Sequence, residues 1–459
     1  MDFPLFFWIS LIVLAALITE AVLRWDRAWA KPAVAVYFTV GAWYPGNLVY
    51  SGIRHFQGLF SDAIIQAAIL QFILFLVVFR LGIPIACKLL IKRVSAPQAG
   101  ALMVPFHQQI SPLFWSVFTL WIVLFLVGTV RLDGDILPVI WPPLSHEKVS
   151  LFVHEGIGGK TGFITAIAQY SYQLSCAFFG VAFVLSRGWI RVFAILLMCF
   201  TWPYFLFDRA RSSQLAIFMP MLISYLLLGQ ARLLFKSLMA TAGIAFIYCW
   251  FILVSIYRSD YDMTKFLSAP RQSSRSFLEN RHMGLDMMEE LCNVNLFIER
   301  GTYKINYGER YLHEVLNVIP RAIWNNKPLL GFDYAVARGF MNPNASFREA
   351  GVVATVSTGM IGQGVVNFGR FFGAAAAALL MSLWVGLLAR HWSERWVIGK
   401  TFLFILGLGL TFNLGRDITL LVLWPFVFAS FGVWFLGKYA KRPYFYIPTK
   451  PSIRNRSSK

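Results

Sequence analysis

The residues best suited to chemistry lie at three polar places in a strongly apolar chain. Two of these places are short, at residues 208–214 and 413–417, and the third is a long polar interval over residues 258–351. The candidate residues are Arg211, Arg416 and Asp417 in the short places, and Arg310, His313, Glu314, Arg321, Lys327, Arg338 and Arg348 in the long one. Ionisable residues beside apolar segments are candidates for function, because charge is costly to bury in a membrane.

These residue types suit the transfer of a group from a diphosphate. The long polar interval holds nine arginines and three lysines, and a guanidinium binds diphosphates and carboxylates through two hydrogen bonds at once. Arginines stabilise the negative charge that develops as a diphosphate leaves, and a carboxylate or histidine can deprotonate an acceptor hydroxyl. The interval also holds eleven acidic residues against its twelve basic ones. A few placed arginines, and not a general basic surface, would therefore bind the anion.

A purely structural interpretation competes with the functional one at each place. In the two short places, Arg209 and Arg416 can be interfacial residues paired with the aspartates beside them. In the long interval, two pairs have the four-residue spacing of contacts on a helix surface, namely Arg310 with Glu314 and Glu309 with His313. Both interpretations stay open at this point.

No pattern in the sequence predicts a metal or nucleotide site. The five cysteines lack CxxC spacing, and His146 and His154 lack the HExxH spacing of zinc proteases. Residues 156–161 (GIGGKT) lack the GxxxxGK[ST] spacing of a phosphate loop. We therefore expect no metal and no cofactor.

The elements that must position these residues are membrane-spanning helices. The chain is 58% hydrophobic and only 14% charged, with a mean hydropathy of +0.62, which is typical of a polytopic helical membrane protein. We therefore predict an all-α fold with about eleven membrane crossings. The apolar segments are 3–23, 33–51, 63–86, 112–130, 161–186, 190–207, 212–229, 238–257, 371–389, 399–415 and 418–437.

The distribution of lysines and arginines predicts which side each loop faces. Twenty of them lie in one set of connections and in the C-terminal tail, against seven in the short loops opposite. The positive-inside rule then predicts a cytoplasmic C-terminus, an N-terminus outside, and a long polar interval facing outward. This topology explains the net charge of +19 better than a nucleic-acid partner does. We expect transmembrane helices over 1–257, interrupted by a small outer loop at 131–160. A large outer loop follows over 258–370, with a re-entrant or interfacial helix at 352–369. Transmembrane helices over 371–437 and a basic cytoplasmic tail over 438–459 complete the expected organisation.

Short motifs in the long interval resemble a known family. Residues 307–311 (YGERY) and 319–328 (IPRAIWNNKP) are similar to the outer-loop pattern "IPR.lWp.KP" of the Wzy-type polymerases of bacterial surface polysaccharides. Three further features match the family: a glycine-rich apolar run at 351–373 that leads into a helix, the turn 211–213, and the Arg-acid pair 416–417. The chain has two asparagines where many members have proline or glycine between the tryptophan and the basic residue.

The resemblance implies a polymerase in the bacterial inner membrane. Such an enzyme joins oligosaccharide repeat units that are linked to undecaprenyl diphosphate, at the periplasmic face, without a metal. On this basis we expect Arg211, Arg321 and Arg416 to bind or stabilise the diphosphate, with help from Lys327, and Asp417, Glu314 or His313 to act as general base; Arg310, Arg338 and Arg348 are further candidates for substrate contact. The implied partners are the lipid-linked oligosaccharide, membrane lipids and a chain-length regulator.

Three other functions share parts of this pattern. A ligase that moves finished glycans from the same lipid carrier has the same architecture and nearly the same chemistry. A lipid-sugar glycosyltransferase of the C-type fold requires an acidic residue in its first outer loop, where this chain offers only Asp62. A transporter predicts charged residues deep in mid-helix, and only Arg80 and Arg370 approach that position.

Overall fold

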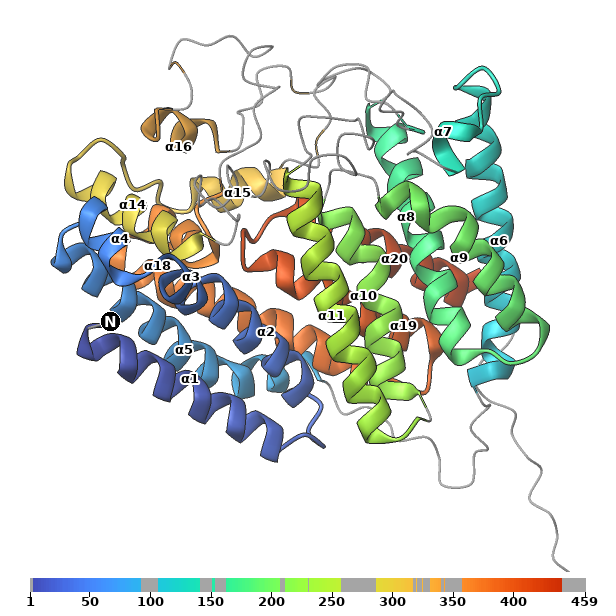
Figure 1. The fold of residues 1–459 in the computed structure, drawn as a ribbon, viewed down its shortest axis with the longest axis horizontal. Coiled ribbons are helices and arrows are strands. Elements are labelled where there is room, and N and C mark those ends of the chain that lie inside the picture. Colours follow the sequence, from blue (N-terminus) through green and yellow to red (C-terminus); the bar gives the residue numbers. More distant parts are fainter. Residues whose placement is uncertain are drawn as a thin grey trace, which may run out of the picture.

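All regular secondary structure in the described part of the chain is helical (Figure 1). The structure is a computed structural model. It describes residues 3–91, 106–140, 151–152, 162–206, 211–229, 231–256, 286–316, 319, 324, 331–339, 342 and 357–439. The predicted all-α class is confirmed for these residues.

Each of the predicted apolar segments forms helix in the structure. The helices are α1 (Leu5–Leu23), α2 (Ala30–Trp43), α3 (Pro45–Ser51), α5 (Asp62–Leu90), α6 (Phe106–Val130), α8 (Gly162–Leu185), α9 (Trp189–Leu206), α10 (Arg211–Leu228), α11 (Leu233–Ile256), α18 (Met360–Ser393), α19 (Ile398–Leu414) and α20 (Leu420–Tyr439). The segment predicted at 33–51 is broken into α2 and α3 at Pro45, since proline has no N–H for an intrahelical bond and suits the first position of a new helix.

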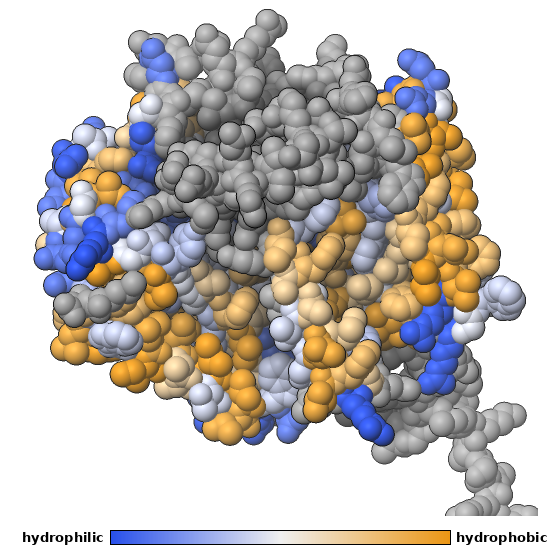
Figure 2. Space-filling model, in the orientation of Figure 1, coloured by the Kyte–Doolittle hydropathy of each residue, from blue (hydrophilic) through white to orange (hydrophobic). Residues whose placement is uncertain are grey.

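Several of these helices are apolar and long enough to cross a membrane. Five of the described helices have the necessary length and composition, namely α1, α5, α6 from Gln109 onward, α9 and α18. Shorter apolar helices cover Ser213–Leu228, Ile398–Leu414 and Val422–Phe435. Figure 2 shows apolar side chains across the middle of the molecule and hydrophilic ones toward its ends. The protein is therefore a membrane-embedded helical protein.

The helices α5 and α18 form the centre of one half of the bundle. Gly82 of α5 lies so close to Ser382 that a Cβ at residue 82 would approach its Oγ to 2.4 Å. Ser382 Oγ also donates to the Phe79 carbonyl at 3.1 Å. Small residues at such a contact let two helix backbones approach closely, which is the usual basis of helix packing in membranes.

Helix α18 contains a sharp reversal. Gly369 has φ 80° and ψ 179°, so Met360 to Phe368 forms a separate helical segment before the longer part of α18 begins. The segment folds back on the longer part, because a Cβ at Gly364 would lie 2.1 Å from the Gly373 carbonyl oxygen. A straight helix would separate two residues nine apart by about 13 Å. The described part of the predicted helix at 352–369 is this segment, which we call the returning segment.

Three helices of the long polar interval pack at one end of the bundle. They are α14 (Met287–Glu299), α15 (Glu309–Leu316) and α16 (Phe332–Ala337), drawn in yellow and orange at the top of Figure 1. Helix α14 packs on α18, α5 and α3, and its Asn295 exchanges two amide hydrogen bonds of 2.8 and 2.9 Å with Gln71 of α5. We call this end the α14–α16 end. Two short helices, α4 (Ile53–Leu59) and α7 (Leu137–Ile140), complete the described elements.

The contact between the two glycines makes a testable prediction. Gly364→Ala should lower the free energy of unfolding by about 1–3 kcal/mol, because the new methyl group meets backbone that cannot rotate away. The melting temperature of the purified protein in detergent measures the effect. The matched control is Gly432→Ala in α20, where a Cβ meets nothing within 4 Å and no loss is expected. Equal melting temperatures for the two variants would contradict the reversal.

Candidate functional site

Arg310 is the central residue of the candidate site. It lies in the first turn of α15 and is only 6% exposed, yet its Nε and Nη1 have no hydrogen-bond partner in the described part of the chain. The returning segment holds α15 in place: the Asn306 N–H donates to the Val366 carbonyl at 3.0 Å, and the Tyr311 N–H donates to Asn367 Oδ1 at 3.4 Å. A buried arginine with unbonded N–H groups is prepared to bind an anion.

Asp417 lies in the turn between α19 and α20, close enough to Arg310 for each group to shift the pKa of the other. Gln363 of the returning segment clamps this turn, donating to the Ile418 carbonyl at 3.3 Å and accepting from the Ile418 N–H at 2.9 Å. The Met360 N–H donates to the Gly415 carbonyl at 3.2 Å. Asp417 Oδ1 is buried and has no hydrogen-bond partner among the described residues. The clamp therefore fixes the turn that carries Asp417.

The electrostatics of the two groups favour proton transfer at Asp417 and anion binding at Arg310. Burial raises the pKa of Asp417, although Arg310, Ser357 and Arg416 oppose the shift. Burial also acts against the charge of Arg310, but Asp417, Tyr303, Asp333 and Glu314 outweigh it and raise the pKa of the guanidinium. Arg310 therefore keeps its positive charge, while Asp417 is a carboxyl group that accepts a proton more readily than an exposed one.

The two pairs with four-residue spacing in α15 have different environments. Glu314 is 6% exposed and lies one turn after Arg310 on the inward face, so the interpretation of Arg310 and Glu314 as a surface pair is wrong. His313 Nε2 lies 3.7 Å from Glu309 Oε1, and Glu309 is 64% exposed. That second pair is a contact on the helix surface, as its structural interpretation predicts.

The remaining candidates are placed in part. Arg416 is exposed, and its Nε donates to Ser357 Oγ at 2.7 Å, so this residue borders the site from the side of the turn. Arg211 is the first residue of α10, and its side chain is outside the described part. Arg321, Lys327 and Arg348 also lie outside the described residues, as does most of the basic tail at 438–459.

Arg338 belongs to a second polar cluster at the α14–α16 end. Its Nη2 donates to Glu290 Oε1 at 3.0 Å, and the Tyr334 hydroxyl donates to Glu290 Oε2 at 2.5 Å. Burial raises the pKa of Glu290 to about 7, against the opposing effect of Arg338 and Tyr334; Asp286 and Glu289 raise it further. This cluster fastens α16 to α14.

Several residues of the site were not predicted from the sequence. They are Gln363 and Asn367 of the returning segment, Ser357 just before it, and Tyr44 at the end of α2, whose hydroxyl oxygen accepts from the Ile361 N–H at 2.7 Å. The signal that was available is the four-residue spacing of the two amides inside an apolar, glycine-rich run. Buried amides at that spacing indicate one polar helix face directed at a partner.

Comparison of the chain with protein-family models, curated proteins and solved structures finds no match. Within the described residues, no three His, Cys, Asp or Glu side chains come together as a metal-binding group. The chemistry of the site is therefore argued from its own geometry.

The second polar cluster predicts a pH dependence of stability. The pKa of Glu290 rises from an ordinary 4.5 to about 7 on folding, so the folded state binds a proton that the unfolded state releases. The protonated Glu290 side chain therefore stabilises the folded state fully below pH 4.5, and this stabilisation is lost as pH rises through 7. Glu290→Gln, which is neutral at every pH, should gain roughly 3 kcal/mol relative to the native protein between pH 4.5 and 8.

Melting temperatures of the native and Glu290→Gln proteins across this pH range measure the difference. Glu299→Gln is the control, because Glu299 is exposed at the end of the same helix. Parallel profiles for the native protein and the Glu290→Gln variant would contradict the prediction.

Proposed function

We propose that this protein is a polymerase that joins oligosaccharide repeat units linked to undecaprenyl diphosphate, by glycosyl transfer at the periplasmic face of the bacterial inner membrane. In this proposal the eleven apolar segments cross the membrane, the N-terminus lies outside and the C-terminus in the cytoplasm. The α14–α16 end then faces the periplasm, and the returning segment re-enters the membrane from that side. The resemblance of residues 307–328 to the Wzy-type polymerases supports this assignment.

The observation that carries the proposal is the pair formed by Arg310 and Asp417. Arg310 supplies a buried cation whose Nε and Nη1 have no partner among the described residues, and Asp417 supplies a carboxyl group whose buried Oδ1 likewise has none there. A transfer reaction from a lipid diphosphate requires both functions, a charge to stabilise the leaving group and a base to activate the acceptor. Neither function requires ATP, which would be absent on the periplasmic side.

The proposed reaction is a glycosyl transfer at the anomeric carbon. The acceptor hydroxyl of an incoming unit attacks the anomeric carbon of the growing chain, and its proton passes to Asp417. The bond between that carbon and the diphosphate oxygen breaks, and the lipid diphosphate leaves with the electron pair, stabilised by Arg310. Glu314 and His313 are the other candidate bases from the sequence; Glu314 lies on the same inward face as Arg310.

The other arginines extend the anion site in this proposal. Arg416 lies at its edge, fixed by Ser357, and Arg211, Arg321 and Lys327 are expected to complete the contacts with the diphosphate. Arg348 remains a candidate for contact with the sugar. Arg338 is a weaker one, because its guanidinium binds Glu290. No metal or cofactor is part of the mechanism, and the expected partners are the lipid-linked oligosaccharide, membrane lipids and a chain-length regulator.

Substitutions of the central pair test the function. Asp417→Asn keeps the shape of the side chain but removes the base, and Arg310→Lys keeps the charge but removes the planar donors. Each should reduce polysaccharide to single repeat units, with a loss of at least tenfold in polymer, while Arg300→Ala should not, since Arg300 is exposed in the same interval. Gel analysis of lipid-linked glycans measures chain length, and an immunoblot confirms protein level. Native chain lengths in both variants would overturn the site.

Arg416→Ala and Arg321→Ala make a parallel test of the wider anion site. Both should also shorten the product to single repeat units at normal protein level, because less positive charge then faces the leaving diphosphate. The product that accumulates in cells lacking the protein separates polymerase from ligase. Single units on the lipid carrier support a polymerase, whereas full-length polymer retained on the carrier would identify a ligase.

A further inference from the structure

Helix α15 has the reverse of the usual arrangement for a helix at a water-exposed surface. Its charged residues Arg310 and Glu314 are each 6% exposed and point inward, whereas Glu309, at its first position, is 64% exposed. Its aliphatic residues Leu312 and Val315 are 56% and 61% exposed and point outward. A helix facing water directs its apolar side toward the core and its charges toward solvent. The outward side of α15 therefore suits an apolar environment.

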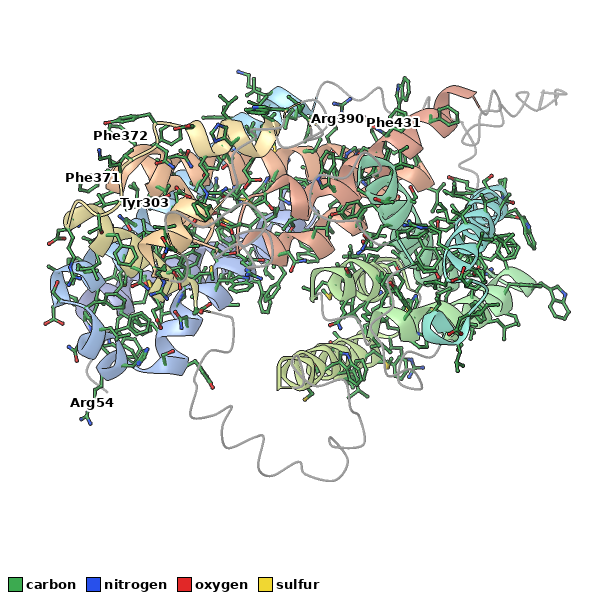
Figure 3. The ribbon with its side chains drawn as sticks, turned by 90° about the horizontal axis from the view of Figure 1, so that it is seen from above. Arg54, Tyr303, Phe371, Phe372, Arg390 and Phe431 are labelled. Carbon is green, nitrogen blue, oxygen red and sulfur yellow. The ribbon has the colours of Figure 1, made fainter. Side chains whose placement is uncertain are left out.

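The exposed apolar surface continues onto the reversal of α18. Phe371 and Phe372, just after Gly369, are 76% and 79% exposed, and Figure 3 shows both projecting from the edge of the molecule. Phe368, just before Gly369, connects them to α15, because its ring centroid lies 6.2 Å from that of Tyr311. We call Phe368, Phe371 and Phe372 the aromatic elbow.

Charge at the elbow is directed away from this surface. Arg370 lies between the aromatic residues, but its Nη2 donates to Glu299 Oε2 at 2.6 Å and to the Asn295 carbonyl at 3.2 Å. Both partners belong to α14. The elbow thus separates a polar contact on one side from bare aromatic rings on the other.

The same surface extends along a helix that is long and apolar enough to span the membrane. Phe372, Leu379 and Leu383 are spaced seven and four residues apart, so they lie on one face of α18, and all three are exposed. On a membrane-embedded helix such a face contacts acyl chains. The aromatic elbow prolongs this face, and no charged residue of the elbow points outward. A continuous apolar surface of this kind is unstable in water, so lipid is the partner that fits it best.

We infer that the outward side of α15 and the aromatic elbow lie in the bilayer leaflet on the α14–α16 side and contact phospholipid acyl chains. Helix α15 is then an interfacial helix that lies in the plane of the leaflet, with Leu312 and Val315 inserted. Arg310, on its opposite side, is held at the depth of the lipid headgroups. This inference concerns a lipid surface and stands whether or not the protein is a polymerase.

Photo-crosslinking in membranes tests the inference. The photoreactive amino acid p-benzoylphenylalanine is placed at Leu312 or at Phe372 of the full-length protein, membranes are irradiated, and mass spectrometry identifies the adducts. Phospholipid adducts are expected at both positions. Leu379 is the positive control within the span, and Arg300, an exposed charged residue that follows α14, is the negative control.

Two results would overturn the inference. Adducts at Leu379 without adducts at Leu312 and Phe372 would show that the elbow and α15 lie in water. A crosslinked dimer of the protein at Leu312 or Phe372 would show that a second copy, and not lipid, covers this surface. Lipid adducts at both positions, at least fivefold above those at Arg300, would support it.

Discussion

The contact of Gly364 with Gly373 is the constraint on which the α14–α16 end depends. It allows the chain to reverse at Gly369, a residue whose φ of 80° is unfavourable for other residues. Only because the returning segment lies against α18 can Gln363 reach the backbone of Ile418, next to Asp417. A backbone contact between two glycines thus supports the turn that carries Asp417.

The surroundings of Arg310 explain how this buried arginine stays charged although its Nε and Nη1 have no partner in the described part of the chain. An isolated buried charge is costly, and the usual remedy is a direct ion pair. Arg310 is instead surrounded by several acidic or hydroxyl groups, among them Asp417, Asp333 and Glu314, which stabilise its charge. Its Nε and Nη1 have no partner among the described residues. Such an arrangement keeps binding energy for a ligand, because no internal bond has to break when an anion arrives.

The sequence was sufficient to predict the apolar helices and only part of the site. Apolar runs of sufficient length form helices wherever they occur, since backbone groups in an apolar environment must bond within their own segment. Pro45 broke one expected helix, a local effect that outweighed hydropathy. Arg310, Glu314 and Asp417 were selected by residue type, but their meeting requires the reversal at Gly369. A glycine-rich run permits such a reversal without specifying it. Likewise, the pairing of Arg338 with Glu290 joins residues 48 apart and has no local signal.

The two polar clusters are not independent, because α16 contributes to both. Tyr334 binds Glu290, while Asp333, its neighbour, accepts from the Tyr303 hydroxyl and is one of the carboxylates that stabilise the charge of Arg310. When Glu290 is ionised, the ion pair with Arg338 and the hydrogen bond from Tyr334 offset part of the cost of burying its charge and keep α16 attached to α14. Movement of α16 would carry Asp333 away from Arg310 and leave that guanidinium with less compensation. A free anion would then bind Arg310 more strongly, so the affinity of the site follows from how firmly α16 is held.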